Sequence, residues 1–109
     1  MRFELDQRGG ARVLSVHGEI DLATARDLTE EIDNVLREPA AQFVLDLRGV
    51  TFMSSLGISA LIAAHNRVQA QAGTLTIVIG DRVRRIIQLT GLEQVLSTAS
   101  TVDDAISTS

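Results

Sequence analysis

Two adjacent serines, Ser54 and Ser55, are the residues of this sequence best placed to do chemistry. They stand between a run of apolar residues at 43–47 and a segment, beginning near residue 55, whose apolar residues recur at helical spacing. The first N–H groups of a helix lack partners within it and create positive potential, which suits a capping hydroxyl and also a phosphate. The pair is therefore predicted to cap the helix, to accept a phosphoryl group, or to do both.

Few other residues offer enzymatic chemistry. The chain has no cysteine, which excludes disulfides, thiol catalysis and thiolate metal sites. Its two histidines, His17 and His65, lie in no metal-ligand spacing, and His65 falls on an apolar helix face where a partly buried side chain is expected. No GxSxG elbow and no Walker A motif is present, and lysine is absent. We therefore expect no enzymatic activity, no metal and no cofactor.

The charge pattern narrows the class of partner. The net charge is -4, all ten basic residues are arginines, and three Phe are the only aromatic residues. Nucleic-acid binding usually needs a basic face with aromatic rings, so we expect a protein partner with a basic docking surface instead. The one arginine cluster, Arg82, Arg84 and Arg85, is interpreted as a solvated basic turn, with an anion at this helix start as the weaker alternative.

The elements that must position the serines follow from periodicity and turn residues. A hairpin turn is predicted at Gly9-Gly10, and either Asp21 or Thr24 is predicted to cap the first helix. Gly91 is a predicted C-cap. Strands are predicted over 2–7, 12–17, 43–47, 75–79 and, at the edge, 95–96; helices are predicted over about 24–36, 55–71 and 81–90, with a terminal helical turn at 103–106.

This order predicts an α/β fold, a mixed and mostly parallel sheet of four to five strands with helices packed against it. The 109 residues suffice for one domain, 1–109, whose Ser/Thr-rich C-terminal tail is expected to fray. The sequence has no apolar run of spanning length, and its start is unlike a signal peptide, so we expect no membrane contact and a cytoplasmic location. With no exposed apolar stripe evident, a monomer is expected.

Three segments of the chain resemble bacterial anti-sigma-factor antagonists, the stand-alone members of the STAS domain family. They are HGEIDLATA at 17–25, VLDLRGVTFMSSLGI at 44–58 and IQLTGL at 87–92. The resemblance covers nearly the whole chain and implies a binding module. Members of this family bind an anti-sigma factor, which is a serine kinase, and so release the sigma factor. The kinase then phosphorylates the antagonist and the complex separates, until a phosphatase restores the active form.

The resemblance also implies site residues. Ser55 matches the phosphorylated position of some members, with Ser54 as the alternative. Ser54 replaces the usual aspartate, and Leu56 occupies a position that is the acceptor in other members. The partner-binding residues implied are Glu19, Asp21, Thr24, Met53, Ser54, Ser55 and Gly57.

Each of these residues also has a purely structural interpretation. Asp21 or Thr24 is a helix cap, Met53 fills space, and Gly57 permits close approach. Two other functions stay open: a scaffold or sensor module that is never phosphorylated, and, with less support, a nucleotide-binding protein.

Overall fold

The structure is a computed structural model that describes residues 1–107. The strands are β1 (Arg2–Arg8), β2 (Ala11–Ile20), β3 (Gln42–Met53), β4 (Thr74–Val78) and β5 (Ser97–Ala99). The helices are α1 (Thr24–Val35), α2 (Ser55–Ala70), α3 (Asp81–Thr90) and α4 (Val102–Ser107), with a 3-10 turn at Leu92–Gln94. The fraying predicted for the tail falls partly on residues 108–109, which lie outside the described residues.

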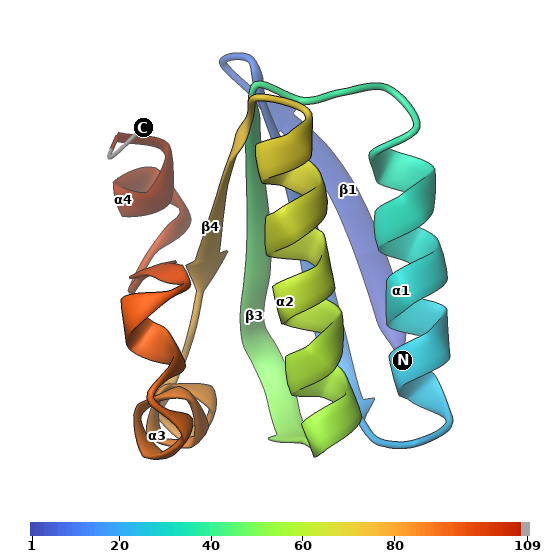
Figure 1. The fold of residues 1–109 in the computed structure, drawn as a ribbon, viewed down its shortest axis with the longest axis vertical. Helices are drawn as coiled ribbons and strands as arrows, with labels where there is room; N and C mark the ends of the chain where they lie inside the picture. The colour runs from blue at the N-terminus through green and yellow to red at the C-terminus, as the bar shows by residue number, and fades with distance from the viewer. Residues whose placement is uncertain (108–109) are drawn as a thin grey trace.

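The five strands form one sheet in the order β1-β2-β3-β4-β5, so the predicted mixed sheet is confirmed. β1 and β2 pair antiparallel through the turn at Gly9 and Gly10, whose φ angles of 54° and 88° are those that glycine tolerates best. The remaining neighbours are parallel. Figure 1 shows α1 and α2 side by side on one face of this sheet. The parallel strands therefore all end at one edge, where α1, α2 and α3 begin.

Alternating residues of β2 and β3 supply two cores. On the face covered by α1, α2 and α3, Leu14, Val16 and Leu45 pack with buried side chains of those helices. On the other face Val13, Val44 and Val78 pack under Val102 and Ala105 of α4. Leu14 and Val16 thus lie on one face of β2 and Val13 on the other. None of the described helices has the length and apolar character needed to cross a membrane.

β2 and β3 are both longer than the sequence pattern predicts. β2 runs on to Ile20 and β3 to Met53, although their last residues include glycines and charges that are typical of loops. Two register shifts in the pairing of β2 with β3, at Ser15/His17 and Gly18/Glu19, realign the strands so that Ile20 finally pairs with Met53. The helix starts that follow are consequently neighbours.

The C-terminal elements differ slightly from the prediction. The edge strand is present but lies at Ser97–Ala99, because the 3-10 turn occupies Leu92–Gln94 and Val95 is its C-cap residue. Gly91 has the predicted left-handed conformation, with φ 73°, and closes α3. The predicted terminal helix is present as α4. His65 is half-buried as expected, and its buried Nδ1 has no hydrogen-bond partner in the part of the chain that the structure describes.

A charged pair, Asp46 and Arg48, lies on the same face of the sheet as α4. Asp46 of β3 is 8% exposed, and its carboxylate accepts hydrogen bonds from Arg48 Nε at 3.0 Å and Nη2 at 2.9 Å. Burial raises the pKa of Asp46, but the hydrogen bonds and charge of Arg48 outweigh it and hold the pKa below its ordinary value. The same pairing raises the pKa of Arg48.

Candidate partner-docking and phosphorylation site

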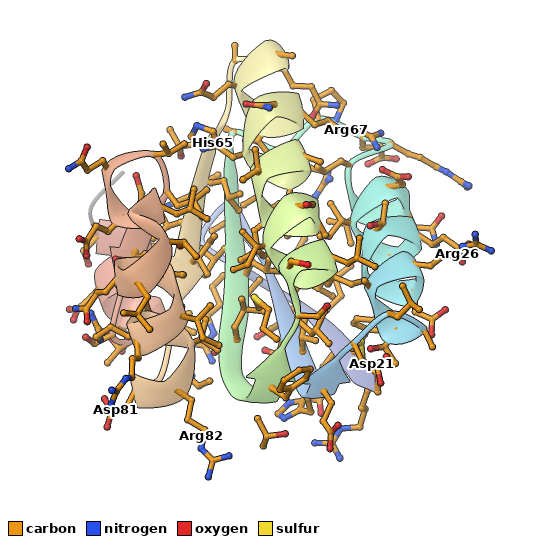
Figure 2. The ribbon with its side chains drawn as sticks, turned by 60° about the horizontal axis from the view of Figure 1, so that its bottom comes forward. Asp21, Arg26, His65, Arg67, Asp81 and Arg82 are labelled. Carbon is orange, nitrogen blue, oxygen red and sulfur yellow. The ribbon has the colours of Figure 1, made fainter. Side chains whose placement is uncertain are left out.

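The loops after β2, β3 and β4 meet at the carboxyl end of the sheet, which we call the switch end. It comprises the starts of α1, α2 and α3 with the residues that precede them. Figure 2 views the molecule with this end forward and shows Asp21 and Arg82 on opposite sides of it. The backbone N–H of Ser54 donates to the carbonyl of Ile20 at 2.8 Å, which ties the β3–α2 turn to the end of β2. The site is thus built on neighbouring strand ends.

Asp21 caps α1 from just ahead of its first turn. Its Oδ1 accepts hydrogen bonds from the N–H groups of Ala23 and Thr24, both at 3.0 Å. In return the N–H of Asp21 donates to Thr24 Oγ1 at 2.9 Å, and the Thr24 hydroxyl donates to the carbonyl of Glu19 at 2.6 Å. This is a reciprocal capping box in which Asp21 and Thr24 act together. The hydrogen bonds from the backbone and side chain of Thr24 hold the pKa of Asp21 below its ordinary value.

The two serines differ in what surrounds their hydroxyls. Ser54 is the N-cap residue of α2, yet its side chain makes no capping hydrogen bond, and its Oγ is buried without a partner among residues 1–107. The prediction that one of the serines caps this helix through its side chain is therefore wrong for Ser54. Ser55 is the first residue of α2 and is exposed. Of the two serines, Ser55 is the exposed one.

Gly57 and Met53 hold the start of α2 close to the sheet. A Cβ at Gly57 would lie 2.7 Å from Met53 Cγ and 2.7 Å from Ile20 Cγ2, so only glycine lets the helix approach this far. Met53 is 5% exposed and belongs to the main core. The predicted structural roles of both residues are confirmed. Since both are buried, they fix the position of the start of α2 and offer little surface of their own.

An apolar groove of about 410 Å³ runs between the first halves of α1 and α2. Its walls are mostly small residues, and two leucines stand out from it into solvent: Leu22 is 78% exposed and Leu56 is 43% exposed. Phe52, at the end of β3, is 49% exposed. The groove, which we call the α1–α2 groove, is lined by Leu22, Ala25, Arg26, Thr29, Leu56, Ser59, Ala60 and Ala63.

All seven predicted partner-binding residues lie at the switch end. Glu19 and Ser55 are exposed, Asp21, Thr24 and Ser54 are half-buried, and Met53 and Gly57 are buried. Sequence reasoning missed Leu22, Leu56 and Phe52 as surface residues. The sequence held one signal for Leu22. Its spacing continues the apolar stripe of α1, but it lies before Thr24, where the helix begins, so the helix does not carry it onto the sheet. Within residues 1–107, no three His, Asp or Glu side chains are grouped closely enough to hold a metal ion.

Comparison with known proteins decides the family. The model of the STAS domain matches residues 2–105. The chain belongs to the STAS domain family. Among named relatives, it is 36% identical over 97 residues to the anti-sigma-F factor antagonist RsfB of Mycobacterium tuberculosis, which covers 89% of this chain and 80% of the relative. It is 29% identical to the anti-sigma-B factor antagonist of Bacillus subtilis, with 76% of each chain covered.

Solved structures agree with this STAS fold. An anti-sigma factor antagonist from Mycobacterium paratuberculosis superposes with a TM-score of 0.91 at 33% identity, covering 98% of this chain and 92% of that one. The antagonist SpoIIAA in its unphosphorylated form superposes with a TM-score of 0.77 at 21% identity, covering 96% and 93%. The second likeness is one of fold.

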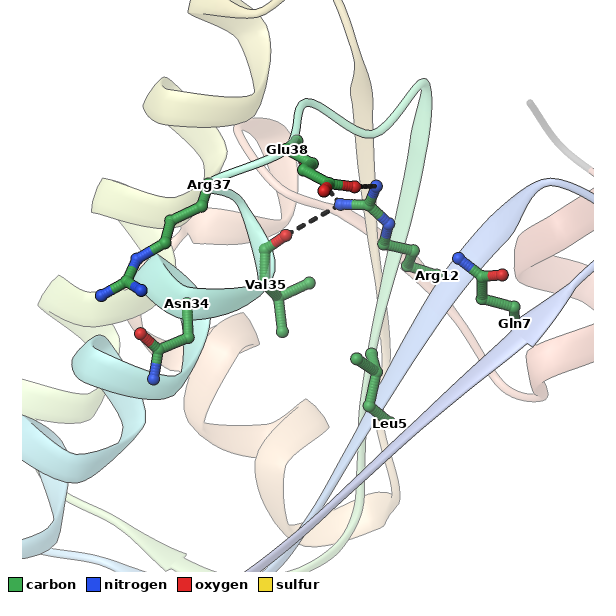
Figure 3. Close-up of a pocket in the computed structure, with 7 residues that line it drawn as sticks. All are labelled: Leu5, Gln7, Arg12, Asn34, Val35, Arg37 and Glu38. Atoms are coloured by element: carbon green, nitrogen blue, oxygen red, sulfur yellow. Dashed lines mark hydrogen bonds and ion pairs between the residues drawn. The ribbon is translucent and has the colours of Figure 1, made fainter.

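The STAS domain has a second hollow, of about 370 Å³, at the opposite end of α1 (Figure 3). Here Arg12 of β2 reaches the last turn of the helix, and its Nη1 donates to the carbonyls of Val35, at 2.8 Å, and Glu38. Its Nη2 lies 3.5 Å from the Glu38 carboxylate. A cation at a helix C-terminus is favourably placed, and these donors are already engaged. We interpret this hollow as a structural joint between β2 and α1.

Proposed function

We propose that this STAS domain is an anti-sigma factor antagonist. It binds an anti-sigma factor that is also a serine kinase, and so releases the sigma factor. Phosphorylation of Ser55 ends the interaction, and a phosphatase restores it. The observation that carries this proposal is the exposed Ser55 at the uncapped start of α2, beside the exposed leucines of the α1–α2 groove. The names of its relatives give independent support.

The proposed docking surface joins two kinds of contact. Leu22 and Leu56 offer apolar area that a partner can bury, and Glu19 and Asp21 place negative charge beside it for a basic partner surface. About two further negative charges on Ser55 would enter this interface. They would be desolvated next to the leucines and next to carboxylates, which weakens the complex. The chain then acts as substrate and binding module, not as an enzyme, and works in the cytoplasm with its partners.

We further propose that the antagonist is a monomer. The exposed edge strand β1 carries a charged residue at every second position: Arg2, Glu4, Asp6 and Arg8. If two copies paired antiparallel about Leu5, Arg2 would oppose Arg8 and Glu4 would oppose Asp6. Like charges directly opposite one another destabilise such a pairing. Sedimentation equilibrium should therefore give the mass of a single chain.

The test is a pull-down of the anti-sigma factor kinases of the same organism with wild type and with Ser55→Glu. We expect wild type to capture such a kinase and Ser55→Glu to bind about tenfold or more weakly, with an unchanged circular dichroism spectrum. Ser97→Glu, an exposed serine on β5, is the matched control and should bind as wild type does. Equal binding by well-folded Ser55→Glu contradicts the switch.

The phosphorylation site is tested separately with kinase and ATP. Ser54→Ala should still be labelled, because the Ser54 hydroxyl is buried, whereas Ser55→Ala should not. If the kinase binds wild type but labels neither serine, the chain is a binding module without the switch. Titration with ATP and GTP in the absence of kinase tests the nucleotide-binding alternative.

A further inference from the structure

The start of α2 has hydrogen-bonding groups that the described residues leave unused. The helix has no side-chain cap, so its first N–H groups lack the acceptor that a capping residue supplies. Beside them the buried Oγ of Ser54 has no hydrogen-bond partner among the described residues. A buried hydroxyl without a partner costs free energy, and it is a donor that a phosphate oxygen would satisfy.

Arg82 brings a positive charge to the same end of the sheet, beside the end of β3 that leads into α2. It lies in the first turn of α3, and its Nη1 is 3.4 Å from the carbonyl of Thr51, four residues before Ser55. In the described part of the chain it has no carboxylate partner within 4.0 Å, whereas Arg12, Arg48 and Arg67 each have one. A cation in the first turn of a helix is unfavourably placed with respect to the helix dipole. An anion nearby would remove that cost.

Charge is distributed unevenly across the switch end. Asp21 lies on the α1 side of this end and Arg82 on the α3 side (Figure 2). Glu19 is the next-to-last residue of β2, on the same side as Asp21. The N-terminus of α3 is also without a side-chain cap and adds positive potential, which Asp81 in the same turn partly offsets. A dianion on Ser55 is therefore repelled from α1 and attracted toward α3.

We propose that phosphoserine at position 55 is held by Arg82, with the free N–H groups of α2 and the Ser54 hydroxyl as further donors. This inference rests on the proposed function, in which Ser55 receives the phosphoryl group. In that transfer the Ser55 oxygen bonds to the γ-phosphorus of ATP, ADP leaves, and the hydroxyl proton is released. The arginine–phosphate pair draws the phosphate across the start of α2 and stabilises the phosphorylated form.

The experiment uses the full chain with phosphoserine introduced at position 55 by genetic encoding, so that no kinase is needed. Phosphorus NMR titration measures the second pKa of the phosphate, ordinarily about 6. We expect a lowered pKa in the wild-type background and a return toward the ordinary value in Arg82→Gln, because Arg82 favours the dianion. Arg85→Gln, an exposed arginine on the same helix, is the matched control and should leave the pKa lowered.

Thermal unfolding supplies a second readout. Phosphoserine at position 55 should raise the Tm of wild type and of Arg85→Gln, and the rise should be smaller in Arg82→Gln. Equal phosphate pKa values and equal Tm shifts in wild type and Arg82→Gln would overturn the proposal. That outcome is independent of the proposed function, which fails instead if unphosphorylated wild type captures no anti-sigma factor.

Discussion

Gly57 of α2 and Ile20 at the end of β2 are so close that a methyl group on Gly57 would stand 2.7 Å from Ile20 Cγ2. Backbone and core, not a loop, therefore set the position of Ser55, two residues earlier.

Gly57→Ala should lower the free energy of unfolding by about 1–3 kcal/mol, because the added methyl overpacks the junction between α2 and β2. Urea unfolding measures the change. Gly80→Ala is the control, since its methyl would approach no atom closer than 3.9 Å, and a loss below about 1 kcal/mol is expected. Equal losses in the two variants would contradict the close approach at Gly57.

Thr24→Val should lower the free energy of unfolding by about 1 kcal/mol, because valine keeps the shape but removes the hydroxyl of the capping box. Thr29→Val is the matched control: its hydroxyl bonds only to the carbonyl of Ala25 within the same helix. Chemical denaturation of both variants checks the prediction. Identical midpoints for Thr24→Val and wild type would show that the box adds no stability.

Leu22→Ser should weaken binding to the anti-sigma factor about tenfold or more, with little change in stability, because the side chain is 78% exposed in the free protein. Leu89→Ser is an unusually close control, since Leu89 is also 78% exposed but lies on the last turn of α3. Calorimetric titration with the anti-sigma factor gives both affinities. If the two variants bind equally, the α1–α2 groove is not the docking surface.

Asp46→Asn should destabilise the protein by about 1 kcal/mol at neutral pH, because it removes a charged partner from half-exposed Arg48. The folded-state pKa of Asp46 lies below the ordinary 3.8, so its contribution is fully present above that pH and is lost as the pH falls through the folded-state value. The stability difference from wild type should therefore close below pH 3.8. Urea titrations at several pH values measure this gap, with Asp104→Asn as an exposed control; a gap independent of pH contradicts the ion pair.

Most of the fold follows from local sequence patterns. The order of strands and helices, the hairpin at Gly9 and Gly10 and the helix end at Gly91 each depend on short-range rules, and the structure has them all. The ends of β2 and β3 do not follow from such rules. Arg48 and Gly49 suggest a loop when read locally, whereas β3 continues through both, with Gly49 paired to His17 of β2.

The candidate site likewise combines features that local sequence predicts with features that only long-range packing determines. The positions of Ser55 and of the Asp21–Thr24 cap could be predicted, because a helix start is a local feature. Whether the Ser54 hydroxyl is buried depends on how tightly α2 packs on the sheet, and the approach of Arg82 to Thr51 joins residues 31 positions apart in the chain. Contacts of that kind are properties of the folded chain alone.

Hydrogen bonds fasten α1 at both ends to β2: Arg12 donates to the carbonyl of Val35 at one end, and Thr24 donates to the carbonyl of Glu19 at the other. A helix held in this way has little freedom to swing when a phosphate is added next to it. In the proposed function, phosphorylation of Ser55 then changes the charge of the docking surface and leaves its shape nearly unchanged. The rate of switching would be set by the kinase and the phosphatase, with no slow rearrangement of the antagonist in between.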